Sequence, residues 1–180
     1  MAAPFAWSAA ARALAAQAQE GAGDISLSDI RDNWKDLLAP GADVELSTEP
    51  FNLSKEEWRR RLSDIQFRVL REEDTERAYT SPLDKETRQG VYVCAGCSLP
   101  LFTSRMKYDS GTGWPSFFTH IPGHLGTKKD YFLWFLPRTE YHCVRCGGHQ
   151  GHVFDDGPPP TGERWCNNGV ALRFIPYSAG

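Results

Sequence analysis

Long apolar runs and an excess of basic charge are both missing from this sequence of 180 residues. No stretch approaches the roughly 18 apolar residues that a membrane-spanning helix requires. The formal net charge is −3, the pI is about 5.9 and no stripe of Lys and Arg is present, so anionic partners gain no electrostatic attraction. We therefore expect no nucleic-acid partner and no membrane partner.

Acidic residues are missing from the N-terminus, where none precedes Glu20, and Arg12 is the one basic residue in the same stretch. Mitochondrial presequences also lack acidic residues, but they are usually rich in arginine, and secretory signals begin with a positive region. Two interpretations stay open, a removed targeting segment and a frayed alanine-rich helix. We predict a cytoplasmic protein, with a mitochondrial location as the alternative.

The composition is that of one globular domain. Hydrophobic residues make up 41% of the chain and aromatic residues 12%, which is enough to bury a single core. We place an N-terminal extension at residues 1–50, partly low-complexity and either a targeting segment or disordered, and the main domain at residues 51–178.

Short helices are expected near the start of the main domain. Ser54 with Glu57, and Ser63 with Gln66, have the spacing of capping boxes, which begin helices. A further helical pattern covers residues 29–38 and is stopped by a proline, whereas the charged stretch 71–89 is typical of a loop.

Strand-like runs dominate the chain from residue 90 onward. Runs of β-type residues between Gly and Pro punctuation lie at residues 91–94, 131–136, 141–144 and 170–176. They are too close together to hold crossover helices. We therefore predict a mainly β, antiparallel domain preceded by short N-terminal helices.

Cysteine is scarce, with five in the chain, and four of these form two CxxC pairs: Cys94 with Cys97, and Cys143 with Cys146. Two such pairs can surround one ion with four sulfurs, for which Zn²⁺ is the usual occupant. The alternatives are two disulfides or a redox-active CxxC. Because four sulfurs leave no open coordination position, we predict one structural zinc that pins two hairpins together.

Cys166 lies outside both pairs, in the stretch RWCNNG. A lone cysteine is more often a small buried hydrophobe than a nucleophile. If residues 164–168 are extended, however, Arg164, Cys166 and Asn168 share one face, and a nearby cation favours the reactive thiolate. The same face would continue as an apolar stripe over residues 170–174, unless Gly169 introduces a bulge.

Two further stretches carry residues suited to chemistry or binding. His149 and His152 lie in a glycine-rich segment, where a spacing of three can bring both imidazoles to one side of a turn. They could also be surface histidines without a role. Trp114 follows Gly111 and Gly113 and precedes a proline, and is either a core residue or the wall of a small apolar pocket.

In this order the motifs resemble a known family. A CxxC, SGTGWPSF, a second CxxC, GHQGHVFDDGP and RWCNNGVALRF are similar to the methionine-R-sulfoxide reductase B family (MsrB) in its zinc-containing form, over residues 54–176. The resemblance implies a peptide-methionine (R)-S-oxide reductase, with an MsrB-like catalytic domain of two antiparallel sheets and the zinc far from the catalytic cysteine.

The resemblance also implies roles for individual residues. Cys166 matches the nucleophile, which attacks the sulfoxide sulfur and is left as a sulfenic acid. His149 and His152 match the histidines near the sulfoxide oxygen, with His152 as the proton donor. The remaining matches are Trp114 as the wall for the substrate methyl group, Asp156 as a polar partner in binding, and Arg164 and Asn168 as residues that shape and polarise the thiol site.

Several positions depart from the family pattern. Thr112 occupies the position of the resolving cysteine of two-cysteine members, so the resemblance implies a monomer recycled by an external thiol, thioredoxin or a glutathione-type system. Gln150 replaces the usual leucine between the histidines, and we expect it to change the polarity of the pocket without affecting the chemistry. Trp165 and Gly169 stand where a smaller aromatic residue and a serine are common.

Two other classes of protein are compatible with part of this pattern. A non-catalytic zinc-knuckle module that binds a partner protein needs the four paired cysteines but has no use for Cys166, His152 and Trp114 together. A zinc-ribbon nucleic-acid binder is disfavoured by the acidic charge balance.

Overall fold

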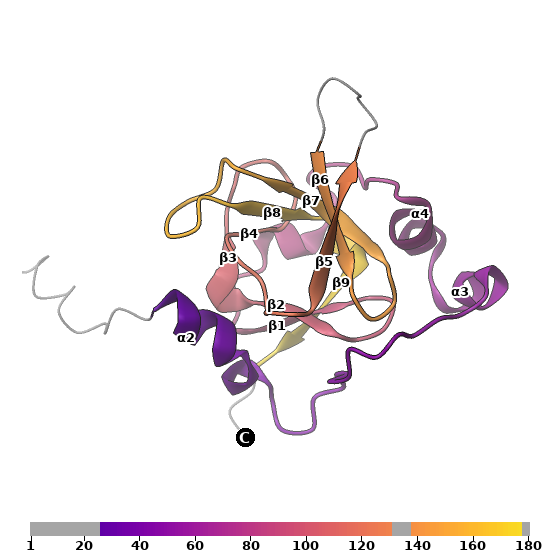
Figure 1. The fold of residues 1–180 in the computed structure, drawn as a ribbon, viewed down its shortest axis with the longest axis horizontal. Helices are drawn as coiled ribbons and strands as arrows, with labels where there is room; N and C mark the ends of the chain where they lie inside the picture. The colour runs from indigo at the N-terminus through magenta and orange to yellow at the C-terminus, as the bar shows by residue number, and fades with distance from the viewer. Residues whose placement is uncertain (1–25, 131–137, 178–180) are drawn as a thin grey trace, which may run out of the picture.

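The computed structural model describes residues 26–130 and 138–177 of the chain (Figure 1). The strands of these residues form two antiparallel sheets, one of three strands and one of six. In spatial order the smaller sheet holds β2 (Pro100–Thr103), β1 (Gly90–Cys94) and β9 (Leu172–Pro176). The larger holds β3 (Lys107–Tyr108), β4 (Ser116–Phe117), β8 (Arg164–Asn167), β7 (His149–Phe154), β6 (Arg138–Cys143) and β5 (Leu125–Asp130). The prediction of a mainly β fold with two antiparallel sheets is confirmed.

Aromatic side chains from both sheets meet in the core. Phe102 of the smaller sheet stacks on Phe117 of the larger one, with ring centroids 4.0 Å apart. Tyr92 and Tyr141, one from each sheet, pack edge-on against this pair at 5.1 and 6.2 Å. All four are fully buried, so their packing holds the two sheets against each other.

The helices at the start of the main domain form where the capping boxes predict them. Ser54 and Glu57 cap α3 (Lys55–Arg61), and Ser63 and Gln66 cap α4 (Asp64–Glu72), each through reciprocal side chain and backbone hydrogen bonds. Figure 1 shows both helices on one side of the molecule, beyond the larger sheet. The stretch 71–89 is a loop apart from the end of α4 and a short 3₁₀ helix, η2 (Pro82–Lys85).

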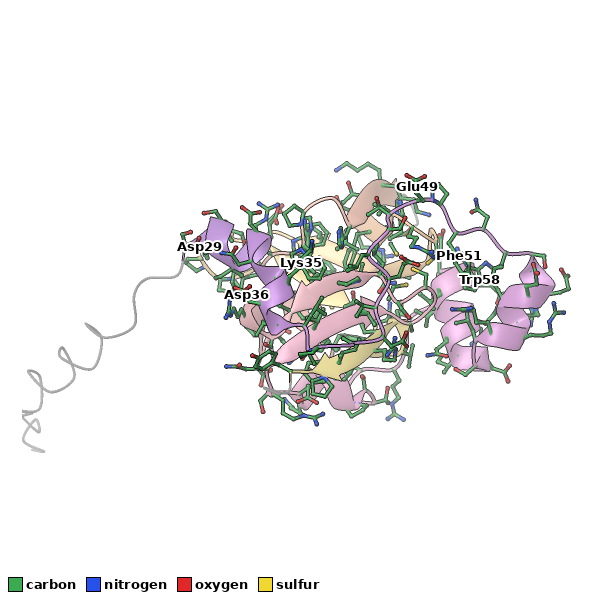
Figure 2. The ribbon with its side chains drawn as sticks, turned by 90° about the horizontal axis from the view of Figure 1, so that it is seen from below. Asp29, Lys35, Asp36, Glu49, Phe51 and Trp58 are labelled. Carbon is green, nitrogen blue, oxygen red and sulfur yellow. The ribbon has the colours of Figure 1, made fainter. Side chains whose placement is uncertain are left out.

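The segment before α3 packs against the smaller sheet. The pattern at residues 29–38 becomes two elements, α2 (Leu27–Asp32) and the 3₁₀ helix η1 (Trp34–Leu37), because Asn33 ends the first with a non-helical backbone. Trp34 and Leu37 are buried, and Leu37 contacts Val91 and Val93 of β1. In Figure 2 the chain runs from this corner along the molecule towards Phe51 and Trp58. The division of the chain at residue 51 stays a prediction.

One expected strand is interrupted. Residues 169–171 form a 3₁₀ helix, η4 (Gly169–Ala171), between β8 in the larger sheet and β9 in the smaller one. The apolar stripe does not continue from Cys166 to residue 174, because the chain turns at Gly169, the position at which the prediction allowed a break, and changes sheet. A further short 3₁₀ helix in the described residues is η3 (Ser104–Met106).

Two expectations concern residues outside this description. The strand-like run at 131–136 and the N-terminal stretch 1–25, on which the targeting interpretation rests, lie outside the described residues. Among those that are described, every helix is too short or too polar to cross a bilayer.

Candidate active site

The four paired cysteines meet in a buried cluster. Cys94 ends β1, Cys143 ends β6, and all four ligand atoms lie within 4.8 Å of one another. The Sγ atoms of Cys94 and Cys146 are 3.6 Å apart and those of Cys97 and Cys143 are 3.5 Å apart, which is far longer than a disulfide. All four thiols are free. The cluster can therefore hold a metal ion, as the spacing predicts.

The chemistry of these four donors also suits a cation. Crowding by the neighbouring sulfurs, together with burial, holds the pKa of the Cys94 thiol well above its ordinary value. Four sulfurs so close together and away from water cannot all carry charge without a counter-ion. A soft divalent cation would satisfy all four at once.

Cys166 lies in a different environment, at the centre of β8. The register of the larger sheet places His152 of β7 directly opposite it on one side and Ser116 of β4 on the other. Its thiol opens into a small cavity of about 140 Å³, which we call the Cys166 pocket. Thr75, Trp114, Arg138, Gly151, His152, Phe154, Cys166, Asn167 and Asn168 line it.

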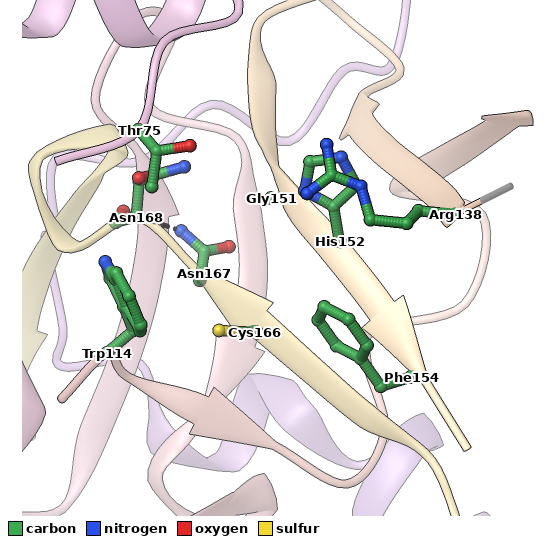
Figure 3. Close-up of a pocket in the computed structure, with 9 residues that line it drawn as sticks. All are labelled: Thr75, Trp114, Arg138, Gly151, His152, Phe154, Cys166, Asn167 and Asn168. Carbon is green, nitrogen blue, oxygen red and sulfur yellow. Dashed lines mark hydrogen bonds between the residues drawn. The ribbon is translucent and has the colours of Figure 1, made fainter. Parts of the chain in front are cut away.

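The pocket has a distinct shape around the sulfur. Figure 3 shows the Trp114 ring on one side of Cys166, with Phe154 and His152 on the other. Its volume is far below the roughly 300–1,000 Å³ of pockets that hold drug-sized ligands. The cavity therefore fits one side chain with an apolar body rather than a large molecule.

Gly151 allows the two central strands to approach closely beside the thiol. A Cβ atom on Gly151 would overlap the carbonyl oxygen of Cys166 on the neighbouring strand. Any larger residue would push β7 away from β8 and separate His152 from Cys166. This glycine is therefore required for the geometry of the site.

Burial and the neighbouring polar groups have opposite effects on the pKa of the Cys166 thiol. Burial raises its pKa above the ordinary value for cysteine, while the Arg164 cation and the Thr112 side chain lower it. Arg164 Nε and a terminal nitrogen donate hydrogen bonds of 2.7 and 2.8 Å to the two carboxylate oxygens of Asp156. The guanidinium carbon also lies 4.3 Å from the ring centroid of Phe154. Arg164 is thus fixed in place beside the pocket, although neither it nor Asp156 lines the cavity.

The two histidines lie close together, but by a different route from the one expected. They belong to a strand, where side chains three residues apart normally face opposite sides. The pairing of β6 with β7 is irregular at His142, so that His149 and His152 have ring centroids 5.5 Å apart. His149 Nδ1 lies 2.9 Å from Glu140 Oε1, and both residues are buried. His152 reaches the Cys166 pocket, whereas His149 lies behind it.

Trp114 forms a wall of the pocket and is held by the loop that follows α4. Its Nε1 donates a hydrogen bond of 3.1 Å to the carbonyl oxygen of Glu76. Tyr79 packs over Gly113, where a Cβ atom would meet its ring, and its hydroxyl donates to the carbonyl of Gly111 at 2.7 Å. Of the two interpretations of this tryptophan, the pocket wall is the one that the geometry supports.

Asn168 and Gln150 occupy buried positions around the end of β8. Asn168 Nδ2 donates to the Gln150 carbonyl oxygen at 3.0 Å, and Asn168 Oδ1 accepts from the Glu76 amide at 3.0 Å. The Gln150 side chain points away from the pocket, with Nε2 lying 3.5 Å from Cys94 Sγ. The expectation that Gln150 changes the polarity of the pocket is therefore wrong.

The structure brings some of the predicted residues together and adds others. Cys166, His152, Trp114 and Asn168 all line the pocket. Sequence analysis missed some of the lining residues. Of these, Phe154 could have been predicted, because it stands two positions after His152 and so shares its face of the strand. Thr75, Arg138 and Asn167 carried no comparable signal.

The fold and the site together define a mainly β protein with a cysteine cluster suited to a metal and a separate free thiol in a pocket for one side chain. Residues 62–176 match the SelR domain family. The chain belongs to that family, which includes the MsrB proteins.

Several named relatives cover this region. The chain is 46% identical over 133 residues to a peptide methionine sulfoxide reductase MsrB of Agrobacterium fabrum, covering 73% of this chain and 98% of the relative. It is 46% identical over 123 residues to the MsrB of Leptospira interrogans, covering 68% and 94%. It is 48% identical over 123 residues to the chloroplastic peptide methionine sulfoxide reductase B1 of Arabidopsis thaliana, covering 68% of this chain but only 61% of that relative.

Proposed function

We propose that the protein is a peptide-methionine (R)-S-oxide reductase, which reduces the R epimer of methionine sulfoxide to methionine. The observation that carries the proposal is the convergence of Cys166, His152 and Trp114 on one pocket of side-chain size. Family membership and the relatives named as MsrB support the same activity.

The reaction transfers one oxygen atom from substrate to enzyme. Cys166 Sγ attacks the sulfoxide sulfur and forms a sulfur–sulfur bond. The oxygen then moves from the substrate sulfur to Sγ as the sulfur–sulfur bond breaks, which releases the thioether and leaves Cys166 as a sulfenic acid. The substrate sulfur is reduced to a thioether while the cysteine is oxidised. Burial raises the pKa of Cys166. The attack needs the Cys166 thiolate, and a proton must reach the sulfoxide oxygen. His152, directly opposite on β7, is the group positioned to relay it.

Residues in the pocket and around it bind and orient the substrate. The rings of Trp114 and Phe154 supply apolar walls for the methyl group and the side-chain methylenes. Arg164, held by Asp156, supplies positive charge beside the thiol. His149, paired with Glu140, supports His152 from behind, and Asn168 holds the end of β8.

The ion in the cysteine cluster is proposed to be a single structural Zn²⁺. Cys94, Cys97, Cys143 and Cys146 would hold it and would leave no coordination position for a substrate. The cluster joins the turn after β1 to the turn after β6, so the ion would stabilise the packing of the two sheets. Cys166 is not among its ligands.

Recycling of the enzyme is proposed to use an external thiol. Two equivalents of thiol convert the sulfenic acid back to the Cys166 thiol, with release of water and formation of a disulfide from the reductant. The four other cysteines of the chain all belong to the metal cluster, and Thr112 lies beside Cys166. Thioredoxin or a glutathione-type system would therefore reduce a monomeric enzyme. A cytoplasmic location, with mitochondria as the alternative, also remains a proposal.

The test is turnover of the separated R and S epimers of an oxidised methionine peptide, with dithiothreitol as reductant. Wild-type protein should consume the R epimer alone, and Cys166→Ser should abolish turnover with unchanged metal content and melting temperature. Turnover retained in Cys166→Ser would contradict the assignment of the nucleophile. An inactive wild-type protein that carries one zinc would favour the non-catalytic zinc-knuckle module instead.

A further inference from the structure

Glu76 is a buried carboxylate at the back of the Cys166 pocket. It lies in the loop after α4, and only 4% of its surface is exposed. Its carboxylate accepts hydrogen bonds from the backbone amides of Gly169 and Val170, the second at 3.0 Å. These two amides begin η4, the turn that interrupts the expected strand immediately after β8. Burial raises the pKa of Glu76, while the two amides lower it.

The backbone of the same residue contacts two walls of the pocket. The amide of Glu76 donates to Asn168 Oδ1 at 3.0 Å, and its carbonyl accepts from Trp114 Nε1 at 3.1 Å. Trp114 and Asn168 both line the Cys166 pocket, but Glu76 itself does not. Four hydrogen bonds therefore connect one residue to the aromatic wall and to the chain just beyond the nucleophile.

The residues around the Glu76 carboxylate and the Gly169 turn are closely packed. A Cβ atom on Gly169 would overlap the side chain of Ser81 and lie 3.1 Å from Glu76 Oε1. A buried carboxylate is costly unless hydrogen bonds compensate it, and removing it leaves two buried amides without an acceptor. The position of Glu76 is thus fixed by the turn that it caps.

We propose that Glu76 is a positioning residue of the active site, which holds Trp114 and the end of β8 at the separation that forms the pocket around Cys166. The inference rests on the proposed function. Glu76 contacts neither the thiol nor the cavity, so it acts through Trp114 and Asn168 rather than on the substrate.

Two substitutions separate the parts of this role. Glu76→Gln keeps the shape but turns one acceptor into a donor that faces a backbone amide, and Glu76→Ala removes both acceptors. We expect kcat/KM for the R sulfoxide to fall by about tenfold in Glu76→Gln, equivalent to about 1.4 kcal/mol, and further in Glu76→Ala. KM should rise and kcat should fall together, since both the wall and the nucleophile strand are displaced.

A matched control distinguishes positioning from a general effect on folding. Asp84 is a similarly buried acid, 6% exposed, that lies in η2 and is not among the residues that line the Cys166 pocket. Asp84→Asn should leave kcat/KM within about twofold of wild type. The loss in the Glu76 variants should persist well below their melting temperature, where the folded fraction is complete.

A spectroscopic measurement tests the inference independently of turnover. The emission of Trp114 is obtained as the difference between each protein and the same protein carrying Trp114→Phe, which cancels the other tryptophans. Glu76→Gln and Glu76→Ala should shift this emission to the red, because the indole gains contact with water, whereas Asp84→Asn should not.

The outcomes separate the two proposals. A wild-type protein inactive on both epimers defeats the proposed function, while the emission shift still decides the role of Glu76. An unchanged Trp114 emission, or activity in Glu76→Gln equal to that of Asp84→Asn, overturns the role of Glu76 even if the wild-type enzyme is fully active.

Discussion

Arg164, two positions before Cys166 on β8, forms two hydrogen bonds of 2.7 and 2.8 Å with the carboxylate of Asp156. The two charged groups have opposite effects on the pKa of the Cys166 thiol. The cation lowers the pKa of Cys166 and the Asp156 carboxylate raises it, against the dominant effect of burial, which raises it. The net pKa lies above the ordinary value of 9.0.

We predict opposite effects from the two members of this pair. Alkylation of Cys166 by iodoacetamide should accelerate with pH through and beyond pH 9, because the thiolate reacts and the pKa is raised. Arg164→Gln should move the midpoint of this profile to higher pH, and Asp156→Asn should move it to lower pH. A shift of both variants in the same direction would contradict this account of the charges.

The position of His152 opposite Cys166 predicts a loss of proton transfer on substitution. His152→Asn should lower kcat by about 10²- to 10⁴-fold, the usual contribution of a general acid or base. His142→Asn provides the matched control, because His142 lies on β6 and does not line the Cys166 pocket. Steady-state turnover of the R sulfoxide measures both variants, and equal losses would argue against a specific role for His152.

The cysteine cluster predicts that the metal supports the fold and not the chemistry. Cys143→Ser should abolish binding of the proposed zinc and lower the melting temperature, because three sulfurs and a hydroxyl hold the ion poorly. Cys166→Ser should keep one zinc per chain and the wild-type melting temperature. Metal analysis and thermal melting measure both variants. Freshly purified wild-type protein without metal would contradict the prediction.

The state of Cys166 after a single turnover follows from its lack of a cysteine partner. Substrate added without reductant should leave a monomer whose mass has increased by one oxygen atom, with Cys166 as the sulfenic acid. Intact-mass spectrometry and a sulfenic-acid probe measure this. Stoichiometric formation of a disulfide between Cys166 and another cysteine of the chain would show that the recycling step is different.

Gln150 offers a test of a departure specific to this chain. Gln150→Leu removes the hydrogen bond to Cys94 Sγ and the 3.4 Å contact of Asn167 Nδ2 with Gln150 Oε1. Because the side chain is fully buried away from the pocket, kcat/KM should stay close to wild type. The free energy of unfolding should change by about 1 kcal/mol, measured by urea denaturation.

Local features of the fold were predictable, whereas features that depend on distant residues were not. The capping boxes at Ser54 and Ser63 act within one turn of helix, so the sequence around them is sufficient. The turn at Gly169 depends on the carboxylate of Glu76, more than ninety residues earlier in the chain. No periodicity of the 170–176 run carries that information.

The same distinction holds at the site. The spacing of the paired cysteines is enough to predict that they act together, because each CxxC is a local unit. Thr75 and Arg138 reach the Cys166 pocket from a loop and from the end of a strand, and only tertiary packing shows that they do. The closeness of His149 and His152 depends on an irregularity in strand pairing that the glycine-rich sequence permits but does not specify.

A cavity of about 140 Å³ has a consequence for which damage can be repaired. If the proposed activity is correct, an oxidised methionine must project alone into the enzyme, with its own backbone left outside. Oxidised methionines on mobile or unfolded stretches can enter the pocket directly. Those buried inside a folded protein can enter only after that protein opens locally. The rate of repair at a given methionine would then depend on how often the structure around it opens locally.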